Sequence, residues 1–482
     1  MLLSKPFGNP SVDRPRAALL YARNPLPLSP RRAMTQHRQP QPYEAARSGP
    51  LNGAVRVPGD KSISQCALML GALATGQTNI AGMLESTGVL GTIEILDRLG
   101  VPIVRTGEDR WRVFGRGVGG LTEPNGDLDL GNSSTRLGMM FGALTGHGFP
   151  ARIADTASPG NPSMEYLLKP LQQMGLQVAA SDRDTLPLTV KGRSQPIPIT
   201  HTLEVPSAQA KSAILLAGLA APGQTTVVEP VATPDHTERM LRQFGAEISV
   251  VETAAGRATT VKGNAELKGR DVFVPADPSL AAFVIAAGAI VPGSDVTVLG
   301  VLFNPARTSF YQTLKEMGAD LAPLNERTEG GEPIADIRVR ASHLHAVRVP
   351  PSRATSMIDD FPILAVVAAT ADGTSRLEGL SERRSEISDK LAATAAGLVA
   401  NGIVARVEGN VLEVEGRTGI AGGGRFTTGL DHRLAMAFLV LGQVSHKPVV
   451  LDDISAIAAN FPLFIDVMTE LGAVMRPAGH KA

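Results

Sequence analysis

A helix-ending phrase that occurs six times constrains the fold of this chain more than any other feature of its sequence. Each copy is a stretch with helical apolar spacing, followed by a glycine and a short apolar segment. A glycine directly after an amphipathic helix is the usual left-handed C-terminal cap. Self-similarity at intervals of roughly 70–85 residues indicates a repeat architecture. The six glycines are Gly100, Gly175, Gly245, Gly318, Gly402 and Gly472.

A second phrase also occurs six times, as a polar cluster that opens a helix of small apolar residues. Each cluster occupies the position of a helix N-cap. Segments rich in β-branched residues, such as TTVVEP and DVTVL, predict strands between the helices. The predicted fold class is therefore α/β, with six repeats of a βαβαββ-like unit. The clusters begin near Asp60, Asn132, Ser207, Asp277, Asp359 and Asp431.

The length of the chain predicts more than one hydrophobic core. At 482 residues it exceeds the size at which a single core stops growing, so we expect two lobes of three repeats each. One lobe is predicted over residues 58–274, and the other over residues 275–482 together with 46–57. Residues 1–45 are predicted to be a disordered tail or the product of a start codon placed too early. The prolines of this segment disfavour the amphipathic helix of a transit peptide.

The charge balance argues against two classes of partner. Lysine plus arginine equals aspartate plus glutamate, 46 each, so the chain has no basic footprint for nucleic acid or an anionic membrane. No apolar run is long enough to span a bilayer.

The one cysteine, Cys66, excludes an intrachain disulfide framework and fits a reducing compartment, so we expect a cytoplasmic protein.

The polar caps predict where a ligand binds. If the repeats within a lobe are related by rotation, the N-termini of their apolar helices converge at one end of the lobe. Each N-terminus presents unpaired N–H groups and about half a positive charge. Two such lobes facing each other form a cleft that suits anionic ligands.

Five segments carry a resemblance to a known family. They are VPGDKSISQCALMLGALATG (57–76), LDLGNSSTRLGMM (128–140), SAQAKSAILLAGL (207–219), SMIDDFPILAV (356–366) and LDHRLAMAFLV (430–440). They resemble the 5-enolpyruvylshikimate-3-phosphate synthase family. The resemblance implies two lobes joined by hinge strands near residues 57–60 and 274–277. It also implies transfer of the enolpyruvyl group of phosphoenolpyruvate to a hydroxyl of shikimate 3-phosphate, with release of phosphate, by a monomer that uses no metal or organic cofactor.

Several positions keep the residue that the resemblance assigns to substrate binding. Lys61 and Ser62 match a lysine and a serine that hold the phosphorylated substrate. Asp359 matches an aspartate that contacts the attacking hydroxyl, and Arg433 matches an arginine that binds phosphoenolpyruvate. The neighbouring His432 is expected to be structural. The remaining matches are Asn132, Thr135, Ser207 and Gln209.

Other charged positions of the family pattern are replaced. Cys66 and Asn161 stand where the family has arginines. Gly138 occupies a third arginine position. The nearby Arg136 is expected to face elsewhere, because two residues along a helix correspond to about 200° of rotation.

The second family signature is altered most. Glu386 replaces a lysine, Ile387 replaces the general acid/base glutamate, and Lys390 replaces an arginine. Isoleucine cannot move a proton, and lysine lacks the bidentate fork that matches a carboxylate or phosphate. Glu386 is the candidate to take the place of the glutamate. Lys390 keeps a charge for substrate binding.

The number of lost charges decides the functional prediction. A hydrogen bond to a charged group contributes about 1.5–3 kcal/mol, so four lost contacts remove roughly 8 kcal/mol, or roughly a millionfold in rate. We therefore predict a diverged enzyme of this family that acts in the cleft on a different, less anionic small molecule, with Asp359, Glu386 and Lys61 as catalytic residues. The alternatives are a true synthase with compensating residues such as Arg136, a non-catalytic binding protein, and an enolpyruvyl transferase for a nucleotide sugar.

Cys66 has two interpretations. Close to a helix N-terminus, it is either a nucleophile with a lowered pKa or a small buried thiol that replaces a larger residue. We expect the second.

Overall fold

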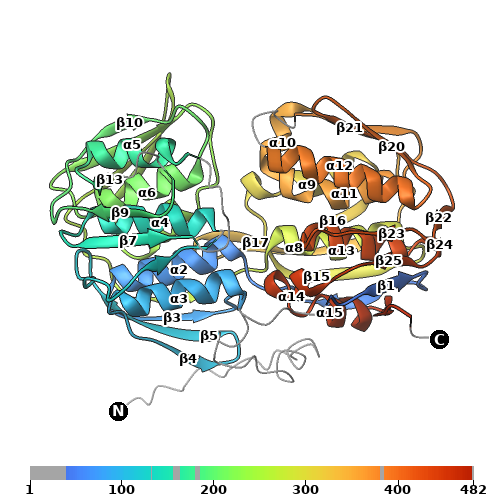
Figure 1. Ribbon diagram of the computed structural model, residues 1–482, viewed down its shortest axis with the longest axis horizontal. Coiled ribbons are helices and arrows are strands. Elements are labelled where there is room, and N and C mark those ends of the chain that lie inside the picture. The colour runs from blue at the N-terminus through green and yellow to red at the C-terminus, as the bar shows by residue number, and fades with distance from the viewer. Residues whose placement is uncertain (1–39, 132, 156–162, 180–184, 380–384, 480–482) are drawn as a thin grey trace, which may run out of the picture.

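The computed structural model describes residues 40–479 apart from residue 132 and residues 156–162, 180–184 and 380–384. Two lobes lie side by side, one mostly blue to green and the other yellow to red with the blue strand β1 (Tyr43–Ala46) added from the start of the chain (Figure 1). Each lobe has its own hydrophobic core. One core draws on residues between 63 and 274 together with Leu302, and the other on residues 45–57 and 276–475. The two-lobed α/β architecture is confirmed, whereas the exact lobe boundaries stay a prediction.

One sheet pattern recurs throughout the described part of the chain. In each four-stranded sheet the first strand is parallel to the second, and the third and fourth are antiparallel to their neighbours. In the first lobe the sheets are β14(Asp271–Phe273)-β3(Thr75–Ala81)-β5(Arg110–Arg116)-β4(Ile103–Gly107), β6(Leu128–Asp129)-β7(Pro150–Ala154)-β9(Leu188–Lys191)-β8(Gln177–Ala179) and β10(Thr200–Thr202)-β11(Gln224–Glu229)-β13(Gly256–Lys262)-β12(Ile248–Thr253).

The second lobe repeats this pattern three more times. Its sheets are β2(Asn52–Val55)-β15(Asp295–Leu302)-β17(Glu332–Arg340)-β16(Asp320–Glu329), β18(Arg348–Val349)-β19(Thr374–Leu377)-β21(Val411–Glu415)-β20(Val404–Glu408) and β23(Arg425–Phe426)-β25(Val449–Leu451)-β1(Tyr43–Ala46)-β26(Val474–Pro477), with a small pair β22(Ile420–Gly422)-β24(Ser445–Lys447) beside the last. The six predicted repeats are therefore present as six equivalent sheets in the described residues.

The inner helices of each lobe are those that the second phrase predicts. They are apolar around most of their circumference, as a helix surrounded by protein must be. All but the first two residues of the helix that begins at Lys61 are buried. These helices are α2(Lys61–Leu73), α4(Ser134–Thr145), α6(Ala208–Gly218), α8(Pro278–Ile290), α11(Phe361–Ala368) and α13(His432–Gly442).

The outer helices end at the six repeated glycines. Each of these glycines has φ between 81° and 106°, the left-handed conformation that the sequence predicts for a helix C-cap. The outer helices are α3(Thr87–Arg98), α5(Glu165–Gln173), α7(His236–Gln243), α9(Ser309–Glu316), α12(Ser385–Ala400) and α15(Phe464–Glu470). The short elements η2(Pro305–Arg307), α10(Pro351–Met357), η3(Ile358–Asp360) and α14(Ser455–Asn460) complete the second lobe.

The chain passes between the lobes twice, at neighbouring points. Gly59 and Ala276 form an antiparallel bridge where the two crossing segments meet. The backbone N–H of Asp60 donates to the carbonyl of Pro275 (2.8 Å), and the N–H of Asp277 donates to Pro58 (2.9 Å). The two hinge strands are thus present, and they deliver Asp60 and Asp277 to the same place.

The predicted tail is too long at its C-terminal end. Strand β1 starts at Tyr43 and pairs with β25 and β26, because its backbone fills the place between them in the sixth sheet. Residues 1–39, the rest of that prediction, lie outside the described part of the chain.

Within the described residues, no helix is both long and apolar enough to cross a membrane.

Candidate active site

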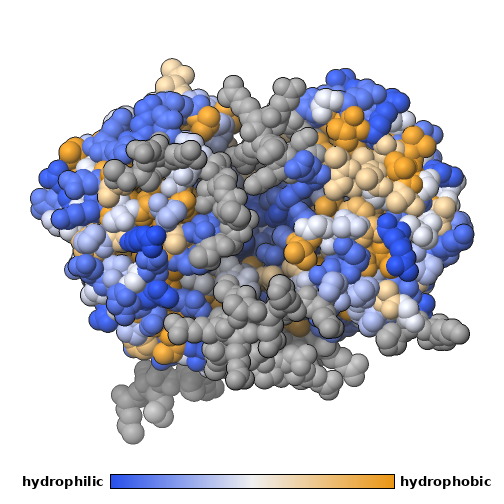
Figure 2. Space-filling view, viewed as in Figure 1, coloured by the Kyte–Doolittle hydropathy of each residue, from blue (hydrophilic) through white to orange (hydrophobic). Residues whose placement is uncertain are grey.

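The N-termini of the inner helices carry the side-chain caps that the sequence predicts. A carboxylate oxygen of Asp60 accepts from the N–H of Ile63 at 2.9 Å, and Asp431 caps the N–H of Arg433 at 2.8 Å. Ser207 and Asp277 cap α6 and α8 in the same way. A hydrophilic recess lies between the lobes on the face shown in Figure 2. These side chains cap the helix N-termini, and the neighbouring cations Lys61 and Arg433 take no part in the capping.

Lys61, the first residue of α2, has charged groups of both lobes around it. Burial lowers the pKa of its ammonium group, and the cations Arg433 and Arg136 lower it further. Asp277 and Asp359 act in the opposite direction. The backbone N–H of Lys61 also lies 3.3 Å from a carboxylate oxygen of Asp277, the N-cap of α8. The N-terminal ends of α2 and α8 therefore meet across the two lobes.

Two ion pairs organise the second-lobe side of the site. A guanidinium nitrogen of Arg433 lies 2.9 Å from a carboxylate oxygen of Asp359, whose side chain is 52% exposed. The ammonium of Lys390 lies 3.1 Å from the carboxylate of Asp431. Asp359 and Arg433 are thus held together and open to solvent, whereas the charge of Lys390 is paired with the N-cap of α13.

The histidine between these pairs carries no charge at neutral pH. Burial lowers the pKa of His432 to about 3, and Arg433 acts in the same direction. A neutral imidazole adds no repulsion against the cations around it.

The remaining predicted substrate contacts lie at the first-lobe helix starts. The hydroxyls of Ser62 and Thr135 are 3.5 Å apart, which links α2 to α4. Ser207 donates its hydroxyl to the side-chain oxygen of Gln209 at 3.1 Å. Asn132 and Asn161 lie outside the described residues, as do the side chains of Glu386 and Ile387 on α12.

Arg136 corrects one expectation from the sequence. It is 4% exposed, and its guanidinium donates to the carbonyls of Gly88 (3.0 Å) and Leu130. Because Arg136 lies in the first turn of α4, its long side chain extends past the helix start toward Lys61. The expectation that it faces away from the site was wrong.

Gly138, the supposed vacant arginine position, is a packing residue. A Cβ atom on it would lie 2.7 Å from the carbonyl oxygen of Gln209, and one on Gly142 would lie 2.4 Å from that of Ala213. Helices α4 and α6 therefore pack with their backbones in contact, and no side chain fits at either glycine.

Cys66 is a structural thiol. It is 2% exposed, its sulfur lies 3.6 Å from the hydroxyl of Thr237, and burial raises the pKa of the thiol to about 12. The nucleophile interpretation is therefore not supported, because the thiolate is the reactive form.

We expect Cys66 to resist a maleimide or disulfide reagent at pH 8 in the native protein and to react fully in guanidinium chloride. Mass spectrometry of the intact chain measures this, because each label adds a fixed mass. Labelling of the native protein as fast as that of the unfolded chain would contradict the assignment.

The sequence analysis did not single out two charged residues near the site, Arg307 and Asp360. Arg307, in η2, pairs with Asp60 and Asp277. Asp360 is 5% exposed, and burial together with the charge of Asp359 raises its pKa to about 7. The 3₁₀ turn that contains Arg307 is three residues long, too short for a repeating sequence pattern. Only the tertiary structure therefore shows that Arg307 lies near the site.

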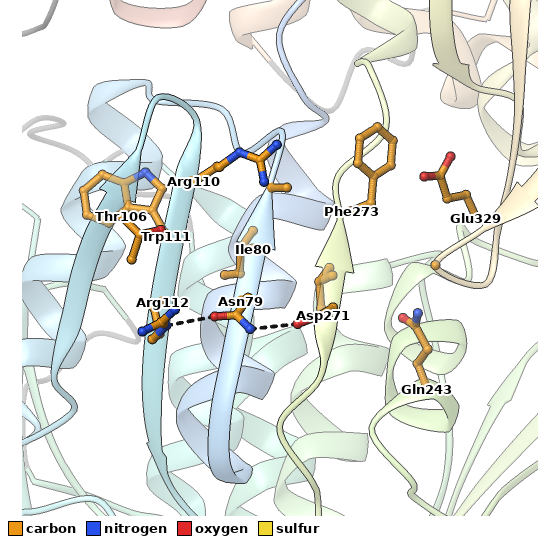
Figure 3. Close-up of a pocket in the computed structure, with 13 residues that line it drawn as sticks. Asn79, Ile80, Thr106, Arg110, Trp111, Arg112, Gln243, Asp271, Phe273 and Glu329 are labelled. Atoms are coloured by element: carbon orange, nitrogen blue, oxygen red, sulfur yellow. Dashed lines mark hydrogen bonds between the residues drawn. The ribbon is translucent and has the colours of Figure 1, made fainter. Parts of the chain in front are cut away.

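A groove of about 500 Å³ lies apart from these residues, where β14 and the turn between β16 and β17 approach each other. Figure 3 shows Arg110, Phe273 and Glu329 at its rim, with Arg112, Asn79 and Asp271 hydrogen-bonded in a row along the sheet. Its two arginines face two carboxylates. The groove therefore has no net charge to select an anion, and it contains none of the predicted site residues.

Comparison with known proteins gives a consistent result. The model of the EPSP synthase (3-phosphoshikimate 1-carboxyvinyltransferase) family matches residues 45–468. The chain is 50% identical over 445 residues to the 3-phosphoshikimate 1-carboxyvinyltransferase of Methylorubrum extorquens, covering 91% of this chain and 98% of that one. The corresponding protein of Rhodopseudomonas palustris is 50% identical over 442 residues, which cover 91% and 99% of the two chains.

Solved structures agree. EPSP synthase from Acinetobacter baumannii superposes with a TM-score of 0.83 at 36% identity, over 90% of this chain and 99% of that one. The enolpyruvyl transferase NikO from Streptomyces tendae shares the fold, with a TM-score of 0.70 at 20% identity.

These relatives overturn the prediction of a diverged enzyme with another substrate. Proteins half identical to this chain over nearly its full length carry the name of the shikimate-pathway enzyme. The chain belongs to the EPSP synthase (3-phosphoshikimate 1-carboxyvinyltransferase) family.

Proposed function

We propose that this chain is a 3-phosphoshikimate 1-carboxyvinyltransferase. It transfers the enolpyruvyl group of phosphoenolpyruvate to a hydroxyl of shikimate 3-phosphate. In the overall reaction the carbon–oxygen bond to the phosphate breaks, an ether bond forms to the hydroxyl oxygen, and the hydroxyl proton leaves with the phosphate. The observation that carries the proposal is the ion pair between Arg433 and the half-exposed Asp359, together with the contact of the Lys61 N–H with Asp277 across the two lobes.

The charges of this site suit two anionic substrates. Burial lowers the pKa of Lys61, and repulsion by the positive charges of Arg433 and Arg136 lowers it further. A phosphate or carboxylate placed among them would relieve that repulsion. Preorganised cations of this kind stabilise developing negative charge without reorganisation.

Asp359 is the proposed acceptor for the hydroxyl proton. Its carboxylate is half exposed, so a substrate can reach it, and the ion pair with Arg433 orients it. A general base must lie within hydrogen-bond reach of the proton that it removes. The same ion pair would bring a substrate bound by Arg433 next to this base.

We assign the second acid/base role to Glu386. It precedes Lys390 by four residues on α12, so the two positions share one face of the helix. The ion pair of Lys390 with Asp431, the N-cap of α13, supports this assignment, because it joins position 390 of α12 to the helix start that carries Arg433. Ile387, at the position of the family's glutamate, has no proton to exchange.

Both halves of the proposed site come from one chain, which supports a monomer as the working unit. A single cysteine supports a cytoplasmic location, because reducing compartments do not favour disulfides.

The test is phosphate release by the purified protein. We expect release at an enzymatic rate only when shikimate 3-phosphate and phosphoenolpyruvate are both present, and an Asp359→Asn variant serves as the negative control. Binding of shikimate 3-phosphate without turnover would instead indicate a non-catalytic protein. No release above background would refute the proposed activity.

A further inference from the structure

Arg307 joins the two lobes through their helix caps. One of its guanidinium nitrogens lies 3.2 Å from the carboxylate of Asp60, and the other lies 3.7 Å from that of Asp277. The side chains of Asp60 and Asp277 are 1% and 10% exposed, and that of Arg307 is 20% exposed. A buried ion pair with two partners fixes its members more firmly than a surface pair does.

The two carboxylates belong to different lobes, and each also caps the N-terminus of a helix. Asp60 caps the N–H of Ile63 at the start of α2. Asp277 caps α8 through the N–H of Ser279 at 2.8 Å, and it also lies 3.3 Å from the N–H of Lys61. The start of α2 is therefore held by one carboxylate from its own lobe and one from the other.

Arg307 also interacts electrostatically with two further carboxylates, those of Asp359 and Asp360. Burial by itself would lower its pKa, but four carboxylates outweigh burial and raise it: Asp60, Asp277, Asp360 and Asp359. The guanidinium thus stays charged and compensates a group of acids that includes the proposed catalytic base. Without it, the buried carboxylates of Asp60, Asp277 and Asp360 would lack this compensating charge in a largely water-excluded space.

The turn that carries Arg307 is itself attached to the first lobe. The side-chain oxygen of Asn304 caps the N–H of Ala306 in η2 at 3.0 Å. The amide of the same side chain donates to Asp235 of α7 (2.8 Å) and to Glu332 of β17 (3.2 Å). The turn that carries Arg307 is therefore hydrogen-bonded to both lobes.

We propose that Arg307 is a positioning residue for the reaction: by binding the N-caps of α2 and α8 together, it sets Lys61 opposite Asp359 and Arg433. This role rests on the proposed function, and it is distinct from substrate binding because Arg307 acts through Asp60 and Asp277. Losing such alignment affects turnover strongly, since a displacement of about 1 Å can cost about 10²-fold in rate.

The test compares three variants by enzyme kinetics and by hydrogen–deuterium exchange of the native protein. Arg307→Met keeps the length of the side chain and removes its charge, whereas Arg307→Lys keeps the charge and loses the fork. Arg338→Met is the matched control, because Arg338 makes a bidentate ion pair with Asp295 on the surface of the same lobe.

We expect Arg307→Met to lower kcat about tenfold or more and to speed exchange in peptides covering residues 57–66 and 275–282, with other peptides unchanged. KM for shikimate 3-phosphate should change less than kcat. Arg307→Lys should restore part of both properties, and Arg338→Met should match the wild type. If hydrogen–deuterium exchange is fast in all peptides of Arg307→Met, that variant is unfolded. The kinetics and exchange of Arg307→Lys then test the proposal in its place.

Two results would overturn the proposal. The first is normal kcat in a folded Arg307 variant, and the second is exchange at residues 57–66 equal to that of the Arg338→Met control. Failure of the proposed function is separable, because it would appear as absent turnover in the wild type. In that case the exchange data still test whether Arg307 holds the two caps.

Discussion

Replacing Lys61 with methionine is expected to lower kcat/KM by about 10²–10³-fold, the usual cost of removing one preorganised donor to developing charge. Lys61 directly follows the first crossing strand, and its backbone N–H lies 3.3 Å from a carboxylate oxygen of Asp277 in the second lobe. The charges of Arg433 and Asp359 both act on the pKa of its ammonium. Methionine keeps the length and apolar stem of lysine but donates no hydrogen bond. Steady-state kinetics with both substrates measures the effect.

The same variant should not lose stability. Burial and the neighbouring arginines lower the pKa of Lys61, which means that its charged form is held at a cost in the folded protein. Removing the charge therefore leaves the unfolding free energy unchanged or raises it. A matched control is Lys169→Met, since Lys169 is an exposed lysine paired with Glu204. Loss of less than tenfold in kcat/KM, or a fall in activity that follows a fall in Tm, would contradict the role assigned to Lys61.

Introducing arginine at position 138 is expected to destabilise the protein by at least about 1–3 kcal/mol, the typical cost of forcing extra atoms into a packed interior. Sequence matching suggests the opposite, namely that Gly138→Arg restores a missing cation. In the structure a Cβ at this position already meets the backbone of Gln209 at 2.7 Å. A backbone atom cannot swing aside as a side chain does, so α4 and α6 must separate.

Urea unfolding of Gly138→Arg measures this cost. Gly148→Arg is the control, because a Cβ on Gly148 meets nothing within 4 Å. We expect the control to unfold at the wild-type midpoint and the Gly138 variant to unfold earlier, with impaired activity because the start of α6 shifts. A Gly138→Arg protein that is as stable as the wild type and more active would show that position 138 is a vacant arginine site.

Local sequence signals predicted most of the fold. The six glycines are left-handed in the structure because a helix cap depends on a few adjacent residues and on the absence of a Cβ atom. The caps Asp60, Ser207 and Asp431 likewise need only their own next turn. Six repeats of the same signals then specify six equivalent sheets.

Part of the candidate site followed from the same reasoning. Arg433 pairs with Asp359, and Lys61 contacts Asp277 across the lobes, as converging helix starts predict, whereas the roles of these residues in the reaction stay a prediction. The prediction of an altered substrate is wrong, because proteins half identical to this chain over nearly its full length are named 3-phosphoshikimate 1-carboxyvinyltransferase. The surroundings of Arg136 and Gly138 could not be predicted, since Arg136 donates to the carbonyl of Gly88 and a Cβ on Gly138 would meet the backbone of Gln209.

The sequence by itself therefore determined the repeated unit, the ends of its helices and the family of the protein, since these depend on contacts within a few residues or on shared ancestry. Only the tertiary structure decided that Cys66 is buried against Thr237, that Gly138 packs on Gln209, and that Arg307 lies between Asp60 and Asp277. Each of these depends on segments far apart in the chain. The burial and charge that one segment imposes on another exist only once both lobes have folded.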